Sequence, residues 1–142
     1  MSHCESTGDP IGAHPPGDFI MPAVTFVEHS GKRILVMDFS NDRDARCVAE
    51  TARDAMHIVR SSGEPHSIRG LLDFSGTPLS GTVRDTMKNM SRNNGPYMKS
   101  VAFLGLGAAL SPVFSGLLFL TGRKNHKVFR KRLDALDWLA KS

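Results

Sequence analysis

The chain has 142 residues, of which 40% are hydrophobic and 23% are charged. This length suits one domain that is large enough to bury a core without disulfides or metal. The ordinary apolar and charged content excludes collagen-like, wholly disordered and disulfide-scaffold proteins. The spacing of Cys4 and Cys47 matches neither a zinc site nor a redox motif, which suggests a reducing compartment, and we therefore expect a cytoplasmic protein.

Positive charge is concentrated near the C-terminal end of the sequence. Residues 1–121 hold 11 basic and 12 acidic side chains, whereas residues 122–142 hold seven basic and two acidic ones. The basic residues that form one candidate surface for an anion or a partner are Arg123, Lys124, Lys127, Arg130, Lys131 and Arg132. A contact with an anionic partner explains such a cluster, and so does a solvated helix end.

The first 22 residues contain four prolines and show no apolar periodicity. They also lack the basic start and the continuous apolar stretch of a secretory signal. We therefore expect a flexible arm over residues 1–22 and one α/β domain over residues 23–142.

From residue 24 the sequence pattern becomes regular. The apolar, β-branched runs Val24–His29 and Ile34–Phe39 flank a glycine-containing turn and predict a β-hairpin. A helix follows, with N-cap candidates in Ser40-Asn41-Asp42 and stop signals at Gly63 and Pro65. Its predicted buried stripe, at three- and four-residue spacing, consists of Ala45, Val48, Ala52, Met56 and Val59.

A third strand is predicted over Ser67–Phe74, and a loop rich in hydroxyl and glycine residues follows it. Thr82 and Asp85 form a weak capping box at the start of a second helix. The predicted buried side of that helix consists of Val83, Met87 and Met90. After its stop signal at Asn94-Gly95-Pro96, the apolar run Tyr97–Gly105 is typical of a strand buried on both faces.

The twenty residues from Val101 to Leu120 carry no charge, as in a membrane-spanning helix. Glycines interrupt this stretch, however, and Ser111-Pro112 is a favourable helix start. We therefore expect no membrane span, but a strand that ends near Gly107 and a helix over residues 112–121.

His126–Phe129 predicts a short edge strand, and the remaining residues predict a last helix. The apolar residues of this helix that we expect to point inward are Leu133, Leu136, Leu139 and Ala140. The predicted order, ββαβαβαβα, indicates an α/β fold: a mostly parallel open sheet, begun by an antiparallel hairpin, with helices packed on it.

Five short motifs in this order resemble the small bacterial SpoIIAA-like proteins, also described as STAS or CRAL-TRIO-like. The matching segments, spread over about residues 24–140, are Gly31–Phe39, Leu72–Gly76, Asn94–Tyr97, Thr121–Arg123 with Lys127–Phe129, and Asp137–Leu139. The resemblance implies a sheet with helices and no established catalysis. It also implies roles in protein–protein regulation or in binding apolar ligands and lipids.

Two departures from this group concern function. Classical members of the wider STAS group carry an Asp-Ser-Ser-Gly-like phosphorylation motif where the second helix begins, and the matching stretch here is Pro78-Leu79-Ser80-Gly81. Ser80, and less so Ser75 or Thr82, is the candidate for phosphorylation, and we expect none because the motif is incomplete. Members also tend to begin the last helix with Asp or Thr, where this chain has Arg130-Lys131-Arg132.

Motifs for catalysis are weak. Gly105–Leu110 lies where a dinucleotide fingerprint would lie but lacks its third glycine, so we expect no cofactor. No hydrolase elbow, zinc-protease or Walker motif is present, and we expect no metal site. Asp38 and Asp73 lie near strand ends, where a small hydrolase or transferase could use them for acid–base work. Because Asp is also common at strand ends for turn formation, we expect no enzyme.

The predicted helix 112–121 is apolar around nearly its whole circumference. The side chains that we consider as ligand or interface residues are Phe114, Leu117, Leu118 and Phe119. Such a helix is covered on both sides or contacts something apolar outside the chain. Three explanations stay open: cover by the arm or a neighbouring helix, a homodimer interface, and a lipid or other apolar ligand.

Together these patterns predict a non-enzymatic, regulatory domain that binds an apolar or lipid-like ligand or a protein partner. The cations Arg130, Lys131 and Arg132 oppose the dipole of the last helix, which favours a functional role such as contact with a phospholipid headgroup or an acidic protein surface. Peripheral membrane contact fits this pattern. Nucleic acid does not, because Phe129 alone is interleaved among the cations.

Overall fold

The computed structural model describes residues 23–40, 44–76, 81–105 and 125–142. Their strands form one five-stranded sheet in the order β1-β2-β3-β4-β5, in which β1 and β2 pair antiparallel and all other neighbours pair parallel. The strands are β1 (Val24–His29), β2 (Lys32–Asp38), β3 (Ile68–Asp73), β4 (Met98–Leu104) and β5 (His126–Phe129). The predicted α/β fold with its opening hairpin is confirmed.

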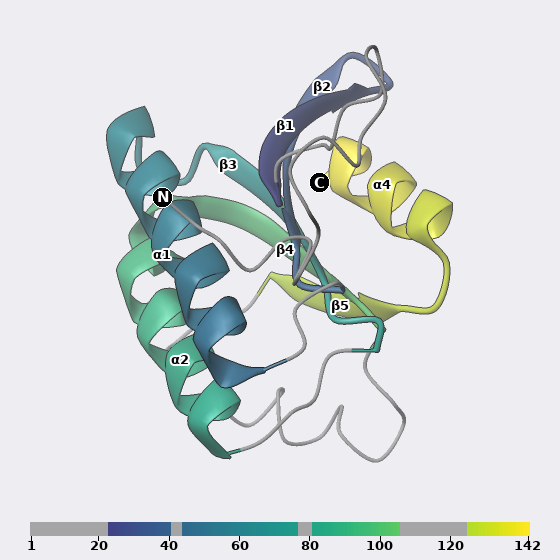
Figure 1. The fold of residues 1–142 in the computed structure, drawn as a ribbon. Helices are drawn as coiled ribbons and strands as arrows, with labels where there is room; N and C mark the ends of the chain where they lie inside the picture. Colours follow the sequence, from purple (N-terminus) through teal and green to yellow (C-terminus); the bar gives the residue numbers. More distant parts are fainter. Residues whose placement is uncertain (1–22, 41–43, 77–80, 106–124) are drawn as a thin grey trace, which may run out of the picture.

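Helices cover both faces of this sheet (Figure 1). On one face lie α1 (Ala45–Ser62) and α2 (Gly81–Asn94), which the short 3₁₀ helix η1 (Gly95–Tyr97) follows, and on the other face lies α4 (Arg132–Lys141). The predicted arm, residues 1–22, and the predicted helix 112–121 lie outside the described residues.

Two apolar cores explain why the central strands are apolar at successive positions. Along β2, Leu35 and Met37 belong to the core under α1 and α2, whereas Ile34 and Val36 belong to the core under α4. Side chains alternate between the faces of a strand, so a strand covered on both sides needs apolar residues at every position. The strand predicted over Tyr97–Gly105 is β4, one residue shorter at each end, and all of its residues except Lys99 are buried, as expected for a strand covered on both faces.

Local backbone signals fix the ends of the first elements. Ser30 and Gly31, with φ of 51° and 77°, form the two-residue turn between β1 and β2. The N-cap of α1 is Asp44, whose side chain accepts a hydrogen bond of 2.9 Å from the Cys47 amide, so the three upstream candidates were wrong. The predicted stop at Gly63 is confirmed by its left-handed φ of 73°.

The exposure of Leu133 in α4 corrects one prediction. Leu139 and Ala140 are buried as expected, but the side chain of Leu133 is 60% exposed. Ala140 lies seven residues after Leu133, on nearly the same side of the helix, because successive helical residues are about 100° apart. The difference in exposure is therefore one along the helix: the first turn leaves Leu133 exposed, whereas Ala140 in the last turn is buried.

The carboxyl ends of β2, β3, β4 and β5 share one edge of the sheet, here called the carboxyl edge, because these strands are parallel. The helix α1 follows β2, α2 follows β3 and α4 follows β5, so all three begin at this edge. None of the described helices is long and apolar enough to cross a membrane.

Candidate functional site

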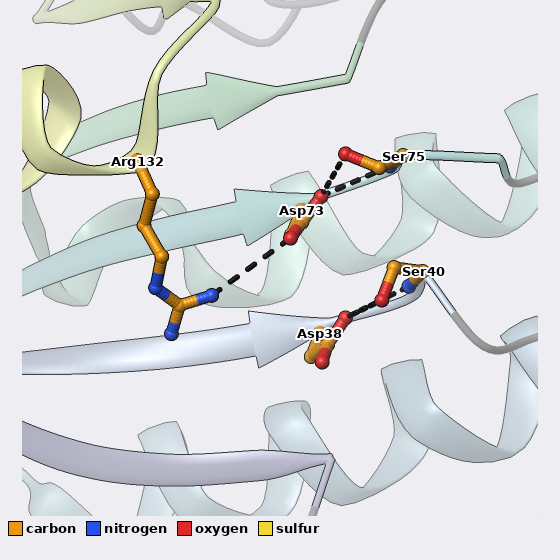
Figure 2. A network of polar contacts seen from close by, with 5 residues as sticks. All are labelled: Asp38, Ser40, Asp73, Ser75 and Arg132. Atoms are coloured by element: carbon orange, nitrogen blue, oxygen red, sulfur yellow. Dashed lines mark hydrogen bonds and ion pairs between the residues drawn. The ribbon is translucent and has the colours of Figure 1, made fainter.

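The same tripeptide ends two neighbouring strands at the carboxyl edge. Asp38-Phe39-Ser40 begins at the last residue of β2 and Asp73-Phe74-Ser75 at the last residue of β3, and Asp38 is the register partner of Asp73. Both carboxylates stand on the α4 face, because they continue the rows of Val36 and Leu71 in the core under that helix. The sheet therefore places two carboxylates and two serine hydroxyls side by side (Figure 2).

Each aspartate is held by a turn with its own serine (Figure 2). The amide of Ser40 donates to Asp38 Oδ1 at 2.8 Å, and its hydroxyl donates to the same oxygen. The amide and hydroxyl of Ser75 donate to Asp73 Oδ1 at 2.9 and 2.7 Å. These are Asp-x-Ser turns, a common structural use of aspartate at strand ends.

The two phenylalanines anchor the motifs from the opposite face. Phe39 and Phe74 are buried, and their rings stack at a centroid distance of 5.0 Å with 5° between the planes. The amide of Phe39 donates to Asp73 O, and that of Phe74 donates to Leu104 O, both at 2.8 Å. The backbone hydrogen bonds of the sheet thus continue one residue past β2 and β3 and hold the backbone at both aspartates in place.

Gly105 allows the end of β4 to approach the second motif closely. Its φ is 80°, and a Cβ atom at this position would lie 2.2 Å from Ser75 N. Only glycine fits both the left-handed backbone and this contact. The glycine that resembled part of a dinucleotide fingerprint therefore has a structural explanation.

Arg132 connects the carboxyl edge to α4. Its Nη1 atom lies 3.8 Å from Asp73 Oδ2, the oxygen that Ser75 leaves unused (Figure 2). The Asp73 side chain is 13% exposed and that of Arg132 is 49% exposed. An ion pair this long and this exposed contributes little to stability, about 0–1 kcal/mol.

The residues around Arg132 form an exposed basic segment, defined here as residues 127–133. Its exposed members are Lys127, Arg130, Lys131, Arg132 and Leu133. Lys131 occupies the N-cap of α4 without a side-chain hydrogen bond, and Asp134 is the acidic residue of the first turn. The structure thus brings four predicted anion-binding residues together and adds Leu133 to them.

In the part of the chain that the structure describes, no group of three or more His, Cys, Asp or Glu side chains could hold a metal ion. The order β1-β2-β3-β4-β5 has no reversal, and ligand crevices of open α/β sheets form where the strand order reverses. The hydrogen bonds of Asp38 and Asp73 to Ser40 and Ser75 are those of turns.

Other predicted site residues lie outside the described residues. They are Ser80, Phe114, Leu117, Leu118, Phe119, Arg123 and Lys124. The phosphorylation, apolar-ligand and homodimer expectations attached to them stay predictions. Of the lesser phosphorylation candidates, Ser75 donates to Asp73, and Thr82 lies within the first turn of α2, which begins at Gly81.

Comparison with known proteins bears on the fold. No protein-family model and no curated protein matches the sequence. A solved structure from Shewanella loihica is similar, with a TM-score of 0.63, 18% identity, and coverage of 82% of this chain and 92% of that one. It is described as an uncharacterized protein of the DUF3478 family with a SpoIIAA-like fold.

The fold is SpoIIAA-like. This agrees with the resemblance that the short motifs carry, whereas the CRAL-TRIO part of that resemblance is not supported. Because the two sequences are only 18% identical, the similarity to the Shewanella protein concerns the fold alone. That protein is itself uncharacterized.

Proposed function

We propose that this SpoIIAA-like chain is a non-enzymatic binding domain whose basic segment, residues 127–133, docks on an anionic partner. One observation carries the proposal: Arg130, Lys131, Arg132 and Leu133 are consecutive and all exposed at the start of α4. A cluster of cations attracts an anionic surface and raises the rate of encounter with it.

The position of these cations supports a functional role. The N-terminal end of a helix carries partial positive charge, and each cation placed there costs about 0.3–1 kcal/mol. Lys131 also occupies the N-cap, where Ser, Thr, Asp or Asn would stabilise the helix by about 0.5–2 kcal/mol. Asp134 in the first turn offsets only part of this cost. Local rules broken in this way tend to mark functional sites.

Negative charge on a partner would offset the unfavourable interaction between these cations and the dipole of α4. Negative charge near the first turn interacts favourably with both the cations and the helix dipole. Because the side chains are exposed, salt screens the attraction, and we expect docking to weaken steeply as ionic strength rises.

A small hydrolase or transferase remains the alternative function, with Asp38 and Asp73 as its acid–base pair. Both Oδ1 atoms already accept two hydrogen bonds from Ser40 or Ser75, which supports the turn role instead. A hydrolytic or transfer activity that disappears in Asp38→Ala and Asp73→Ala, with folding retained, would favour the enzyme.

The test of the proposal is a charge-reversal variant with a matched control. We expect Arg130→Asp, Lys131→Thr, Arg132→Glu to lose binding to an anionic surface at low salt. The control makes the same charge changes at three exposed arginines of α1 and α2, on the other face of the sheet: Arg46→Asp, Arg53→Thr, Arg84→Glu. Equal binding by both variants, or no binding by the wild type, would overturn the proposal.

A further inference from the structure

We propose, on the basis of this docking function, that the anionic partner is the surface of a phospholipid bilayer and that Leu133 is the side chain that enters it. Leu133 is the large hydrophobic residue that stands out as exposed in the described ranges, with 60% of its surface accessible. It directly follows Arg130, Lys131 and Arg132 in the chain. The cluster of charge thus contains an apolar side chain that the fold does not cover.

A bilayer matches this combination because it presents anionic headgroups above an apolar layer. Lysine and arginine can keep their charged ends among headgroups while their methylene stems lie along apolar surface. A leucine between them then reaches the boundary between headgroups and acyl chains, as in peripheral amphipathic segments. A soluble polyanion offers a counter-charge to the cations but nothing apolar to Leu133.

The place of the segment in the fold allows a flat surface to approach it. Leu133 is in the first turn of α4, at the carboxyl edge, and 60% of its surface is accessible. In Figure 1 the connection from β5 to α4 forms an outer corner of the described part, across the sheet from α1 and α2.

The acidic residues close to the segment do not cancel its charge. Asp134 is exposed beside Leu133, Asp73 lies 3.8 Å from Arg132, and Asp137 is hydrogen-bonded to His29 at 2.6 Å. Lys127, Arg130 and Lys131 are the remaining exposed cations of the segment. Charge complementarity with an anionic bilayer is therefore retained.

One partly inserted leucine gives weak, reversible docking. From the apolar area that Leu133 exposes, we expect Leu133→Ser to weaken binding to anionic vesicles by about five- to tenfold. Thermal stability should stay unchanged, since the side chain packs little in the folded protein.

The experiment compares vesicles of phosphatidylserine and phosphatidylcholine with heparin, a soluble polyanion that has no apolar layer. Leu133→Ser should bind vesicles more weakly and heparin as the wild type does. If Leu133→Ser binds vesicles as tightly as the wild type while the charge-reversal variant does not, the bilayer inference is wrong and the docking function stands. If the wild type binds neither probe, the docking function fails and the inference fails with it.

A second measurement observes the insertion itself. Trp138 is the single tryptophan, so Leu133→Trp in a Trp138→Phe background places the reporter at the insertion point. We expect its emission to move to shorter wavelength on anionic vesicles and to be quenched by lipids brominated on their acyl chains. Unchanged emission with the protein fully bound to vesicles would overturn the inference.

Discussion

Asp73 and Arg132 join the end of β3 to the first turn of α4 through a contact of 3.8 Å between Asp73 Oδ2 and Arg132 Nη1. The two bonds from Ser75 hold Asp73 Oδ1 and leave the second oxygen facing Arg132. Arg132 thus belongs both to the carboxyl edge and to the basic segment. An external anion that recruits Arg132 must compete with Asp73.

This competition gives the first prediction. Asp73→Asn should strengthen binding to anionic vesicles by about two- to fivefold, the range expected for release of an exposed ion pair. The control is Asp38→Asn, which makes the same charge change on the neighbouring strand, where Ser40 holds the carboxylate. If Asp73→Asn and Asp38→Asn strengthen vesicle binding equally, the cause is the change in net charge and not the release of Arg132. The same conclusion follows if Asp73→Asn strengthens binding as much in an Arg132→Gln protein as in the wild type.

The second prediction concerns the N-cap of α4. Lys131→Ser should stabilise the protein by about 0.5–2 kcal/mol in thermal unfolding, because a serine hydroxyl can cap the helix. The same change removes a cation and should weaken vesicle binding, by about fivefold if a cation near an anionic lipid surface contributes about 1 kcal/mol. Lys141→Ser is the matched control, since the dipole favours a cation in the last turn, and there we expect a small loss of stability. A Lys131→Ser protein that gains no stability would contradict the capping argument.

The third prediction tests the close approach at Gly105. Gly105→Ala should lower the free energy of unfolding by at least about 1–3 kcal/mol, because a Cβ would meet Ser75 N at 2.2 Å on a left-handed backbone. Gly76→Ala has a similar φ of 77° but meets nothing closer than Ser40 O at 4.0 Å. Chemical denaturation should show a smaller loss for Gly76→Ala, and equal losses would mean that the contact with Ser75 is not important.

The fourth prediction concerns the C-terminal end of α4. Arg69 Nε donates to Leu139 O at 3.0 Å, and its Nη2 donates to Ser142 O at 3.2 Å. Removing a cation bound to the last carbonyls of a helix removes charge-assisted bonds, so Arg69→Met should cost about 1–2 kcal/mol of stability. Lys99→Met replaces an exposed cation on β4 and should be nearly neutral. A neutral Arg69→Met would show that these two hydrogen bonds contribute little to holding α4 on the sheet.

The periodic parts of the fold could be predicted from the sequence. The strand Val24–His29 and the short strand His126–Phe129 have the predicted ends, and Val83, Met87 and Met90 are buried in α2 as expected. In each case the spacing of the apolar residues follows from burial of one face of the strand or helix, so it can be read from the sequence. Helix caps are harder to predict, because several residues near a helix start are suitable N-caps. Asp44 caps α1 in place of the three residues predicted, and Thr82 lies inside α2.

The candidate site could be predicted only in part. The basic residues 127–132 can be recognised in the sequence by their charge, but the exposure of Leu133 cannot, because the buried Ala140 has nearly the same angular position on α4. The repeated Asp-Phe-Ser is also visible, yet only the strand register makes Asp38 and Asp73 neighbours. Their pairing is a tertiary relationship, which no local pattern contains.

The most direct test of the docking account is the partition of the full chain onto phosphatidylserine-containing vesicles at two ionic strengths. The account predicts clear binding near 0.01 M and nearly complete loss near 1 M salt, as the screening length falls from about 30 to about 3 Å. It also predicts no binding to phosphatidylcholine alone and none by the variant Arg130→Asp, Lys131→Thr, Arg132→Glu. Wild-type protein that stays in solution with anionic vesicles at low salt would contradict the bilayer inference, and protein that also fails to bind heparin would contradict the docking function.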